Sequence, residues 1–228
     1  MTFSIVGRDP SSDAFGVAVS TAVPCVGAMV PHAMSGVGAI ATQSYVNVEL
    51  GRRGIPLLQR GLSPRAALEG LLAEDAGANV RQVAGIDAKG RTFAYSGKDC
   101  VGWYGSREGT DYSAQGNMLV GKETVDAMAA AFEAAAGKWL GTRLLAALEA
   151  GQAAGGDKRG RQSAALLVTP MQIATFGAVE FDPLRYEMNI RVDDHPDPVA
   201  ELRRIFDLVL REGRVVAAHA AAQAKSRS

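Results

Sequence analysis

Strand-forming segments that occur in adjacent pairs are the feature of this sequence that most restricts its fold. Residues 2–8 and 15–21 form one such pair around the turn-forming residues 9–13. Residues 80–87 and 91–96 form a second pair around a short Ala-Lys-Gly turn. Strands joined by so few residues pair antiparallel, because a parallel connection needs a longer crossover. The chain is therefore expected to build mostly antiparallel sheets.

Helical periodicity lies between the strand pairs and near the end of the chain. Ser63 followed by Pro64 predicts a capped helix start. Apolar residues at helical spacing predict helices at 64–72, 122–136, 138–148 and 198–209. Further strands are predicted at 36–44, 101–105, 164–169, 173–179 and 186–192. This order predicts the α+β class, in one domain of residues 1–213 followed by an Ala-rich tail or helix extension at 214–228.

Composition excludes several broad classes of function. The 228 residues carry no net charge, which argues against a dedicated binder of nucleic acid or of anionic membranes. Cys25 and Cys100 have no metal-ligand spacing and are expected to be buried thiols in a reducing compartment. The sequence shows no secretory leader and no membrane-spanning run, so the cytoplasm is the expected location. A homodimer is expected only because closed dimers are common among soluble proteins.

A Gly-rich loop with several cations, residues 151–163, joins a predicted helix to a predicted strand. Glycine lets a backbone adopt positive φ and approach a ligand closely. Asp157, Lys158, Arg161 and Gln162 are therefore candidate substrate-binding residues. The loop follows a helix and precedes a strand, which is the wrong order for a phosphate-binding P-loop. A solvated turn is the alternative interpretation.

Thr2 is the candidate nucleophile. It follows the initiator Met1 at the start of the first strand, and a residue this small generally permits removal of Met1. A terminal threonine offers a hydroxyl nucleophile and an α-amine that can act as its base. The reference pKa of such an amine is about 7.7–8.0, which suits proton transfer near neutral pH.

Two further polar groups are candidate site residues. Ser113, Gln115 and Asn117 precede a predicted helix and could position a substrate or stabilise an oxyanion. Turn and helix-cap chemistry explains the same residue types equally well. Thr42 and Gln43 end a predicted strand and could line a pocket beside the first one, or could be ordinary polar residues at a strand end.

Asp193, Asp194 and His195 could together hold a hard divalent cation. Asp197-Pro198 already has a structural role as a helix start, so structural use of this segment is favoured. We therefore expect neither a metal nor a cofactor.

The chain resembles the bacterial and archaeal family known as domain of unknown function 1028. The resemblance rests on residues 2–6, 36–43, 112–119, 150–167 and 191–198, which span nearly the whole chain in order. It implies a four-layer αββα sandwich like that of the N-terminal-nucleophile (Ntn) hydrolases. In that superfamily the nucleophile is an N-terminal Thr, Ser or Cys on the first strand, and Thr2 is the matching position.

The resemblance implies an amide or peptide hydrolase. Thr2 would be the nucleophile, and the polar residues above would position the substrate. Some relatives carry a peptidoglycan-binding domain, which points to peptide or cell-wall amides as substrates. A non-catalytic binding protein on the same scaffold is the alternative. In this sequence only Met1 precedes Thr2, so exposure of the nucleophile is expected to need Met1 removal rather than autoproteolysis.

Overall fold

The computed structural model describes residues 2–169 and 188–211 and contains two antiparallel sheets. The larger sheet has six strands in the spatial order β10-β9-β2-β1-β8-β7. In chain order these strands are β1 (Thr2–Asp9), β2 (Ala14–Thr21), β7 (Trp103–Gly109), β8 (Tyr112–Leu119), β9 (Ser163–Thr169) and β10 (Met188–Val192). β1 therefore lies inside the sheet, with a hydrogen-bonded neighbour on each side.

The smaller sheet has four strands in the order β3-β4-β5-β6. Its strands are β3 (Pro31–Met34), β4 (Gly38–Ser44), β5 (Arg81–Asp87) and β6 (Thr92–Ser96). The helices are α1 (Glu49–Gln59), α2 (Pro64–Ala73), α3 (Glu123–Ala134), α4 (Leu140–Ala153) and a helical segment at 198–211, with short 3-10 turns η1 (Val26–Ala28) and η2 (Ala78–Val80). Within the described ranges, no helix combines the length and the apolar character that a membrane crossing requires.

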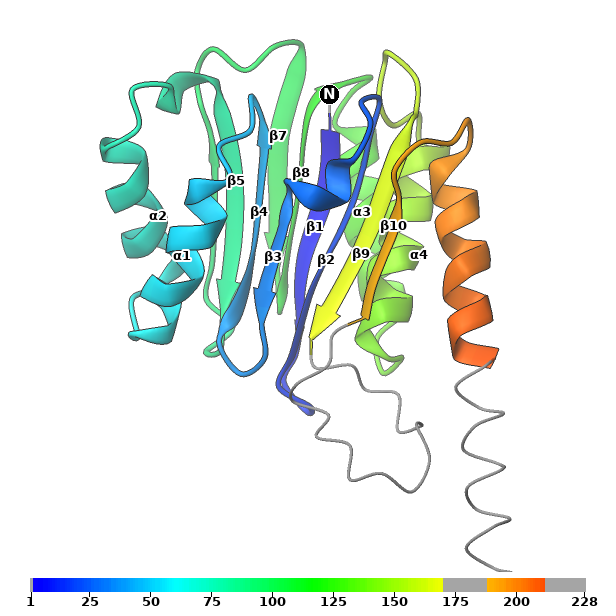
Figure 1. Ribbon diagram of the computed structural model, residues 1–228, viewed down its shortest axis with the longest axis horizontal. Helices are drawn as coiled ribbons and strands as arrows, with labels where there is room; N and C mark the ends of the chain where they lie inside the picture. Colours follow the sequence, from blue (N-terminus) through cyan, green and yellow to red (C-terminus); the bar gives the residue numbers. More distant parts are fainter. Residues whose placement is uncertain (1, 170–187, 212–228) are drawn as a thin grey trace, which may run out of the picture.

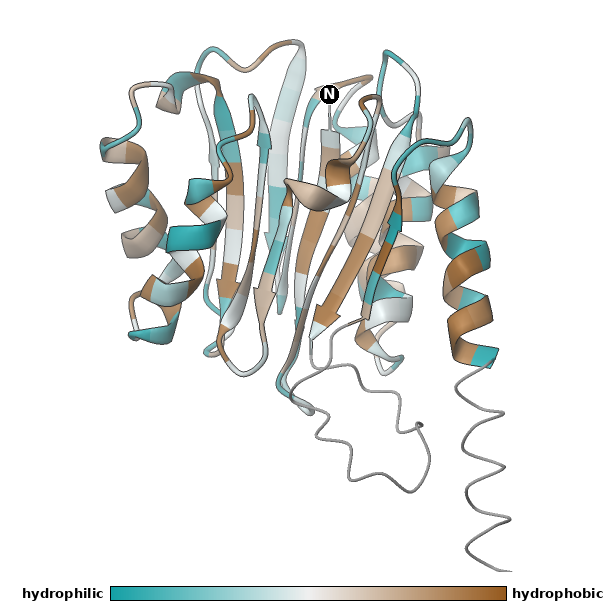
Figure 2. Cartoon of the chain, viewed as in Figure 1, coloured by the Kyte–Doolittle hydropathy of each residue, from teal (hydrophilic) through white to brown (hydrophobic). Residues whose placement is uncertain are grey.

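The two sheets face each other, and each has helices against its other side (Figure 1). One apolar cluster, which includes Val6, Val17 and Ile86, fills the space between the sheets. A second cluster joins α1 and α2 to the smaller sheet, and a third joins α3, α4 and segment 198–211 to the larger sheet. Brown, apolar residues accordingly concentrate on the strands and on the inward sides of the helices (Figure 2).

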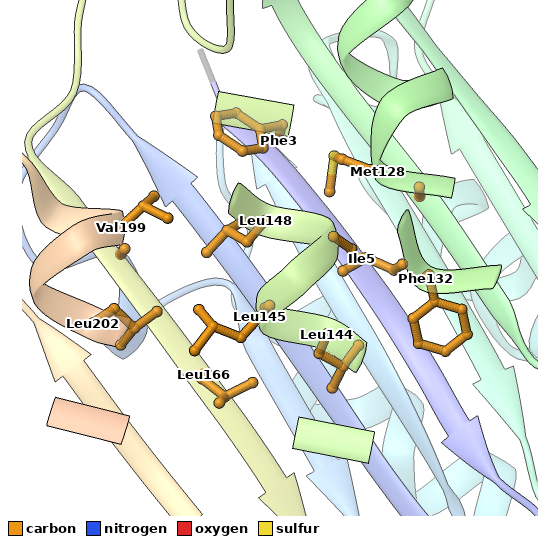
Figure 3. Close-up of a cluster of buried hydrophobic side chains, with 14 of the residues drawn as sticks. Phe3, Ile5, Met128, Phe132, Leu144, Leu145, Leu148, Leu166, Val199 and Leu202 are labelled. Carbon is orange, nitrogen blue, oxygen red and sulfur yellow. The ribbon is translucent and has the colours of Figure 1, made fainter. Parts of the chain in front are cut away.

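Side chains alternate between the two faces of β1, and the odd-numbered ones join the apolar cluster on the helical side of the larger sheet. Phe3 and Ile5 point toward the helices and pack near Met128 and Leu148 (Figure 3). Close approach of α4 needs a glycine at Gly151, because a Cβ there would lie 2.7 Å from the Met128 side chain. Gly151 thus belongs to the buried face of the helix rather than to the loop.

Most predicted elements are confirmed, including the two hairpins, the Ser63 cap on α2 and the helix-then-strand context of the Gly-rich loop. The loop is shorter than expected, at residues 154–162, and Gly155, Gly156 and Gly160 have positive φ as predicted for glycines there. Cys25 is exposed, which corrects the expectation of two buried thiols. The predicted strand at 173–179 and the tail at 214–228 lie outside the described residues.

The segment 112–117 requires a larger correction. The sequence predicts no strand there and leaves a substrate-positioning role and a turn or helix cap equally open, whereas the segment is most of the interior strand β8, which pairs with β1 and β7. Ser113, Gln115 and Asn117 are fully buried on one face of this strand. Their side chains find partners inside the protein: Ser113 donates to Gln115, Gln115 donates to Ser4 of β1, and Asn117 donates to Gln82 of the smaller sheet.

An ion pair at the end of α2 fixes the chain segment that follows β4. The Asp75 carboxylate accepts hydrogen bonds from Asn47 Nδ2 at 2.8 Å, Gly77 N at 2.8 Å and Arg81 Nε at 2.9 Å. Arg81 also donates from Nη1 to the carbonyl oxygen of Tyr45 at 2.7 Å. The hydrogen bond from Arg81 is the main reason that the pKa of Asp75 falls to about 2.

We predict that Asp75→Asn lowers the free energy of unfolding by about 1–2 kcal/mol at pH 6. A carboxyl group whose pKa is lowered by folding stabilises the folded chain above its unfolded pKa, and this stabilisation is lost as pH falls through the folded pKa of about 2. The difference between the two proteins should therefore shrink between about pH 5 and pH 2 in urea titrations. Glu69→Gln, which removes an exposed pair with Arg65, is the control and should cost less than about 0.5 kcal/mol.

Candidate functional site

Thr2 lies at the first described position of β1, between β2 and β8. Its Cα is paired with Thr21 on one side and with Asn117 on the other. The Thr2 Oγ1 atom is 3.1 Å from Thr21 Oγ1, and the residue is only 6% exposed. The two hydroxyl groups share one hydrogen bond and thus lie together where β1 begins and β2 ends.

A buried network of amide side chains holds the carbonyl group of Thr2. Gln43 Nε2 lies 3.3 Å from the carbonyl oxygen of Thr2, and Asn117 Nδ2 lies 3.5 Å from the same oxygen. Both amide nitrogens also donate to Gln82 Oε1, at 2.8 Å and 2.9 Å. Gln82 in turn donates from Nε2 to the carbonyl oxygen of Gly116 at 2.8 Å. The smaller sheet therefore supplies Gln43 and Gln82 to fix a residue of the larger sheet.

The same network continues along the strands, away from Thr2. Ser4 donates to Gln43 Oε1 and accepts from Gln115 Nε2, each at 2.6 Å, and Ser113 donates to Gln115 Oε1 at 3.2 Å. In the register of β1 and β8, Ser113 is opposite Val6, four residues beyond Thr2. Ser113 and Gln115 therefore support the layer between the sheets and do not line the cavity described next.

A cavity of about 200 Å³ opens beside Thr2. Its lining consists of Thr2, Thr21, Val23, Val26, Met29, Val30, Ser44, Tyr45, Val46, Met118 and Arg159. Ser44 and Met118 have positive φ, of 70° and 54°. Such a conformation costs about 1–3 kcal/mol in a residue other than glycine, and it often accompanies functional sites. Sequence patterns give no signal for Thr21 or Tyr45. Arg159 belongs to the Gly-rich loop, but the sequence does not distinguish it from the other cations there.

Asp157 anchors the Gly-rich loop beside this cavity. Its carboxylate accepts from Ala22 N at 3.1 Å and from Arg159 N at 2.8 Å, and it pairs with Arg159 Nη2 at 3.2 Å. Asp157 is 6% exposed, so it acts as an internal brace between the loop and the end of β2. Figure 1 shows this loop, which joins α4 to β9, at the same end of the molecule as the start of β1.

The other candidates in this loop lie outside the cavity lining. Lys158 is exposed. Arg161 Nη1 pairs with Asp197 Oδ1 at 3.0 Å, and Gln162 Nε2 donates to Asp194 Oδ1 at 3.1 Å. The structure thus directs Arg161 and Gln162 toward the segment before residue 198.

The remaining candidates also have structural partners. Asp193 pairs with Arg191 at 2.9 Å, and His195 Nδ1 accepts from Asp197 N at 3.0 Å. Across residues 2–169 and 188–211, no group of three or more His, Cys, Asp or Glu residues is placed to hold a metal ion. Thr42 is fully buried and donates to the carbonyl oxygen of Asn47 at 3.1 Å, outside the cavity lining.

Cys100 lies beneath the cavity wall, with its Sγ atom 3.7 Å from Ser44 Oγ. Burial raises the pKa of this thiol above its ordinary value. A thiol with a raised pKa stays protonated and is a poor nucleophile. Cys100 is also absent from the cavity lining, so it is no competitor of Thr2 as a nucleophile there.

Fold and site together define an α+β domain of two facing antiparallel sheets with a small cavity whose lining includes Thr2 and Thr21. The chain belongs to the Family of unknown function (DUF1028), whose model matches residues 2–202. The crystal structure of protein SPO2555 from Silicibacter pomeroyi, which carries the same family label, superimposes with a TM-score of 0.78 and 31% sequence identity. That match covers 90% of this chain and 88% of the other. No curated protein matches the chain.

We predict that Gln82→Leu lowers the free energy of unfolding by about 2–3 kcal/mol, because buried amides of Gln43 and Asn117 lose their shared acceptor. Ser96→Ala is the matched control. It removes a single partner of Gln82 at the edge of the network and should cost about 1 kcal/mol or less. Urea unfolding followed by circular dichroism measures both effects. Equal stability of Gln82→Leu and the unaltered protein would contradict a supporting role for the network.

Proposed function

We propose that this protein is an amide or peptide hydrolase in which Thr2 is the nucleophile. The observation that carries the proposal is the position of Thr2, which lines a cavity together with its hydroxyl partner Thr21, while the Thr2 carbonyl group is held by Gln43 and Asn117. A nucleophile on an interior strand has little freedom to move away from a bound substrate. Such positioning is a large part of catalysis in general.

The chemistry would proceed through an ester on Thr2 after Met1 has been removed. Thr2 Oγ1 attacks the carbonyl carbon of the amide, and its proton passes to the α-amine of Thr2. The C–N bond then breaks, and the α-amine gives the proton to the departing nitrogen. A water molecule attacks the ester in the same way, which releases a carboxylic acid and restores the hydroxyl group.

Neighbouring polar groups would support this chemistry either by direct contact with Thr2 or through other side chains. Thr21 Oγ1 can orient the Thr2 hydroxyl group across their hydrogen bond of 3.1 Å. Asn117 and Gln43 act as positioning residues through the Thr2 carbonyl group, and Ser113 and Gln115 act one step further away. Asn117 Oδ1 is buried without a partner in the described residues, and a free α-amine on Thr2 would bring a new donor to this neighbourhood.

The arrangement of layers supports the proposed relationship to the Ntn hydrolases. Helices lie against the outer side of each sheet, and Thr2 begins an interior strand of the larger one. The cytoplasmic location and the homodimer stay predictions.

The test combines intact-mass measurement with covalent labelling. We expect the protein purified from its native host to lack Met1 and to be acylated at Thr2 by a β-lactone probe. Thr2→Val keeps the branched shape but removes the hydroxyl group, and it should lose at least about 100-fold of the labelling rate. Thr2→Ser keeps a hydroxyl nucleophile and should retain labelling.

Two outcomes would contradict the hydrolase. The first is a native chain that keeps Met1, because its Thr2 nitrogen would be an amide and could not act as a base. The second is equal labelling of Thr2→Val and the unaltered protein. Either result would favour the alternative of a non-catalytic binding protein that uses the same cavity.

A further inference from the structure

Most of the residues that line the cavity beside Thr2 are apolar. Six of them have aliphatic or thioether side chains, namely Val23, Val26, Met29, Val30, Val46 and Met118. The cavity volume of about 200 Å³ lies below the roughly 300–1,000 Å³ that is typical of sites for drug-sized ligands. The cavity therefore suits one short aliphatic group rather than a sugar or a nucleotide.

An irregularity in β8 brings Met118 to this cavity. The register of β7 and β8 shifts near the end of β8, so that Tyr104 alone lies opposite both Asn117 and Met118. Such a bulge places one extra residue in a strand and re-aims a side chain, and bulges are common next to active sites. The bulge in β8 lies directly beside Thr2, because Asn117 is paired with Thr2.

The two faces of β8 identify Met118 as the extra residue. Ala114 and Leu119 both belong to the apolar cluster on the helical side of the larger sheet. In an unbroken strand, two residues an odd number of positions apart lie on opposite faces. Asn117 still contacts Gln82 of the smaller sheet, so the alternation is interrupted at Met118. Met118 therefore joins the cavity wall instead of the helical side.

The backbone of Met118 is held in a conformation that favours glycine. Its φ is 54°, and glycine is the usual residue at positive φ because it has no Cβ. Met118 N donates to the carbonyl oxygen of Val101 at 3.0 Å, and a Cβ on Gly102 would lie 3.1 Å from Met118 Cα. The neighbouring segment thus packs directly on this backbone. A long side chain at a costly position indicates a role other than stability, and the cavity supplies one.

The acyl part of a substrate is the part that this cavity would hold. In the proposed mechanism the acyl group stays bonded to Thr2 Oγ1 through both steps, whereas the amine leaves after the first step. A chain on the acyl side is thus kept beside Thr2, where the aliphatic lining can contact it.

We propose that the substrates are amides of short aliphatic acids, and that Met118 is the specificity-determining residue that limits the length of the acyl chain. This inference rests on the proposed function, which places the amide at Thr2. The chain would lie between the valines of the lining and the Met118 side chain. The thioether would close the cavity to acyl chains longer than about five carbons, because the cavity is small.

The experiment measures binding to Thr2→Val, so that turnover plays no part. Titrations followed by nuclear magnetic resonance would compare the N-methyl amides of straight-chain acids from acetic to decanoic acid. We expect the affinity to rise about 4-fold for each buried methylene group up to about five acyl carbons, and then to stop rising. N-alkyl acetamides, which carry the chain on the nitrogen, should bind more weakly at each chain length.

Variants of Met118 test whether this residue sets the length limit. Met118→Ala should extend the rise by roughly two or three carbons, which is the length of the side chain removed beyond Cβ. Met118→Leu nearly conserves the volume and should keep the limit. Met34→Ala is the matched control and should leave the limit unchanged, because Met34 is 37% exposed and lies outside the cavity lining.

Met118→Gly separates specificity from stability. It should extend the limit as Met118→Ala does, and it should unfold at no lower temperature than Met118→Ala because glycine adopts positive φ without strain. Thermal unfolding midpoints identify any variant that has merely lost its fold. If Met118→Ala does not fold, Met118→Gly decides the question.

Three results would overturn the proposal: an affinity that does not depend on acyl chain length, tighter binding of the N-alkyl acetamides, or a length limit that neither Met118→Ala nor Met118→Gly moves. Failure of the hydrolase is distinguishable from these results. If Met118 sets a length limit while Thr2 is never acylated, the ligand class stands and the proposed catalysis fails. If Thr2 is acylated and chain length has no effect, the catalysis stands and the ligand class fails.

Discussion

The layer between the two sheets depends on one shared acceptor, Gln82 Oε1. Amide groups of Gln43, from the smaller sheet, and Asn117, from the larger sheet, converge on this oxygen, and all three side chains are fully buried. An unsatisfied buried amide is costly, so these hydrogen bonds favour the relative alignment of the two sheets in which both amide nitrogens reach Gln82 Oε1. The position of Thr2 follows from that alignment, because the same two nitrogens reach its carbonyl oxygen.

The fold class could be read from the sequence because local signals were consistent with one another. Both hairpins and the α2 cap were predicted from turn and cap chemistry. By contrast, α1 gave no clear signal, since it contains Pro56 and two glycines that permit close packing on His32 and Ile40. The sequence of residues 112–117 did not indicate strand β8, because its polar side chains are buried against a second sheet that comes from another part of the sequence.

Less of the candidate site could be predicted. Thr2 was identified from its position after Met1, and Gln43 and Asn117 from the polarity of their segments. The structure then separates residues that hold Thr2 from residues further along the network, and this division depends on register: Asn117 is opposite Thr2, whereas Ser113 is opposite Val6. Arg159 was missed because composition alone cannot tell which cation of a loop points inward. The buried brace Asp157 decides that, through bonds to a strand end 135 residues away.

The interior position of β1 has a consequence for how a ligand reaches Thr2. Edge strands such as β7 and β10 are expected to exchange their amide hydrogens and open first, because among the described strands each has a neighbour on one side only. Opening of those edges would leave the strands around Thr2 paired. Access must therefore come through the connecting segments that carry Val23, Tyr45 and Arg159, which are at least partly exposed. The rate of ligand entry would follow local motions of these loops on the nanosecond-to-microsecond scale, and not the global stability of the sheets.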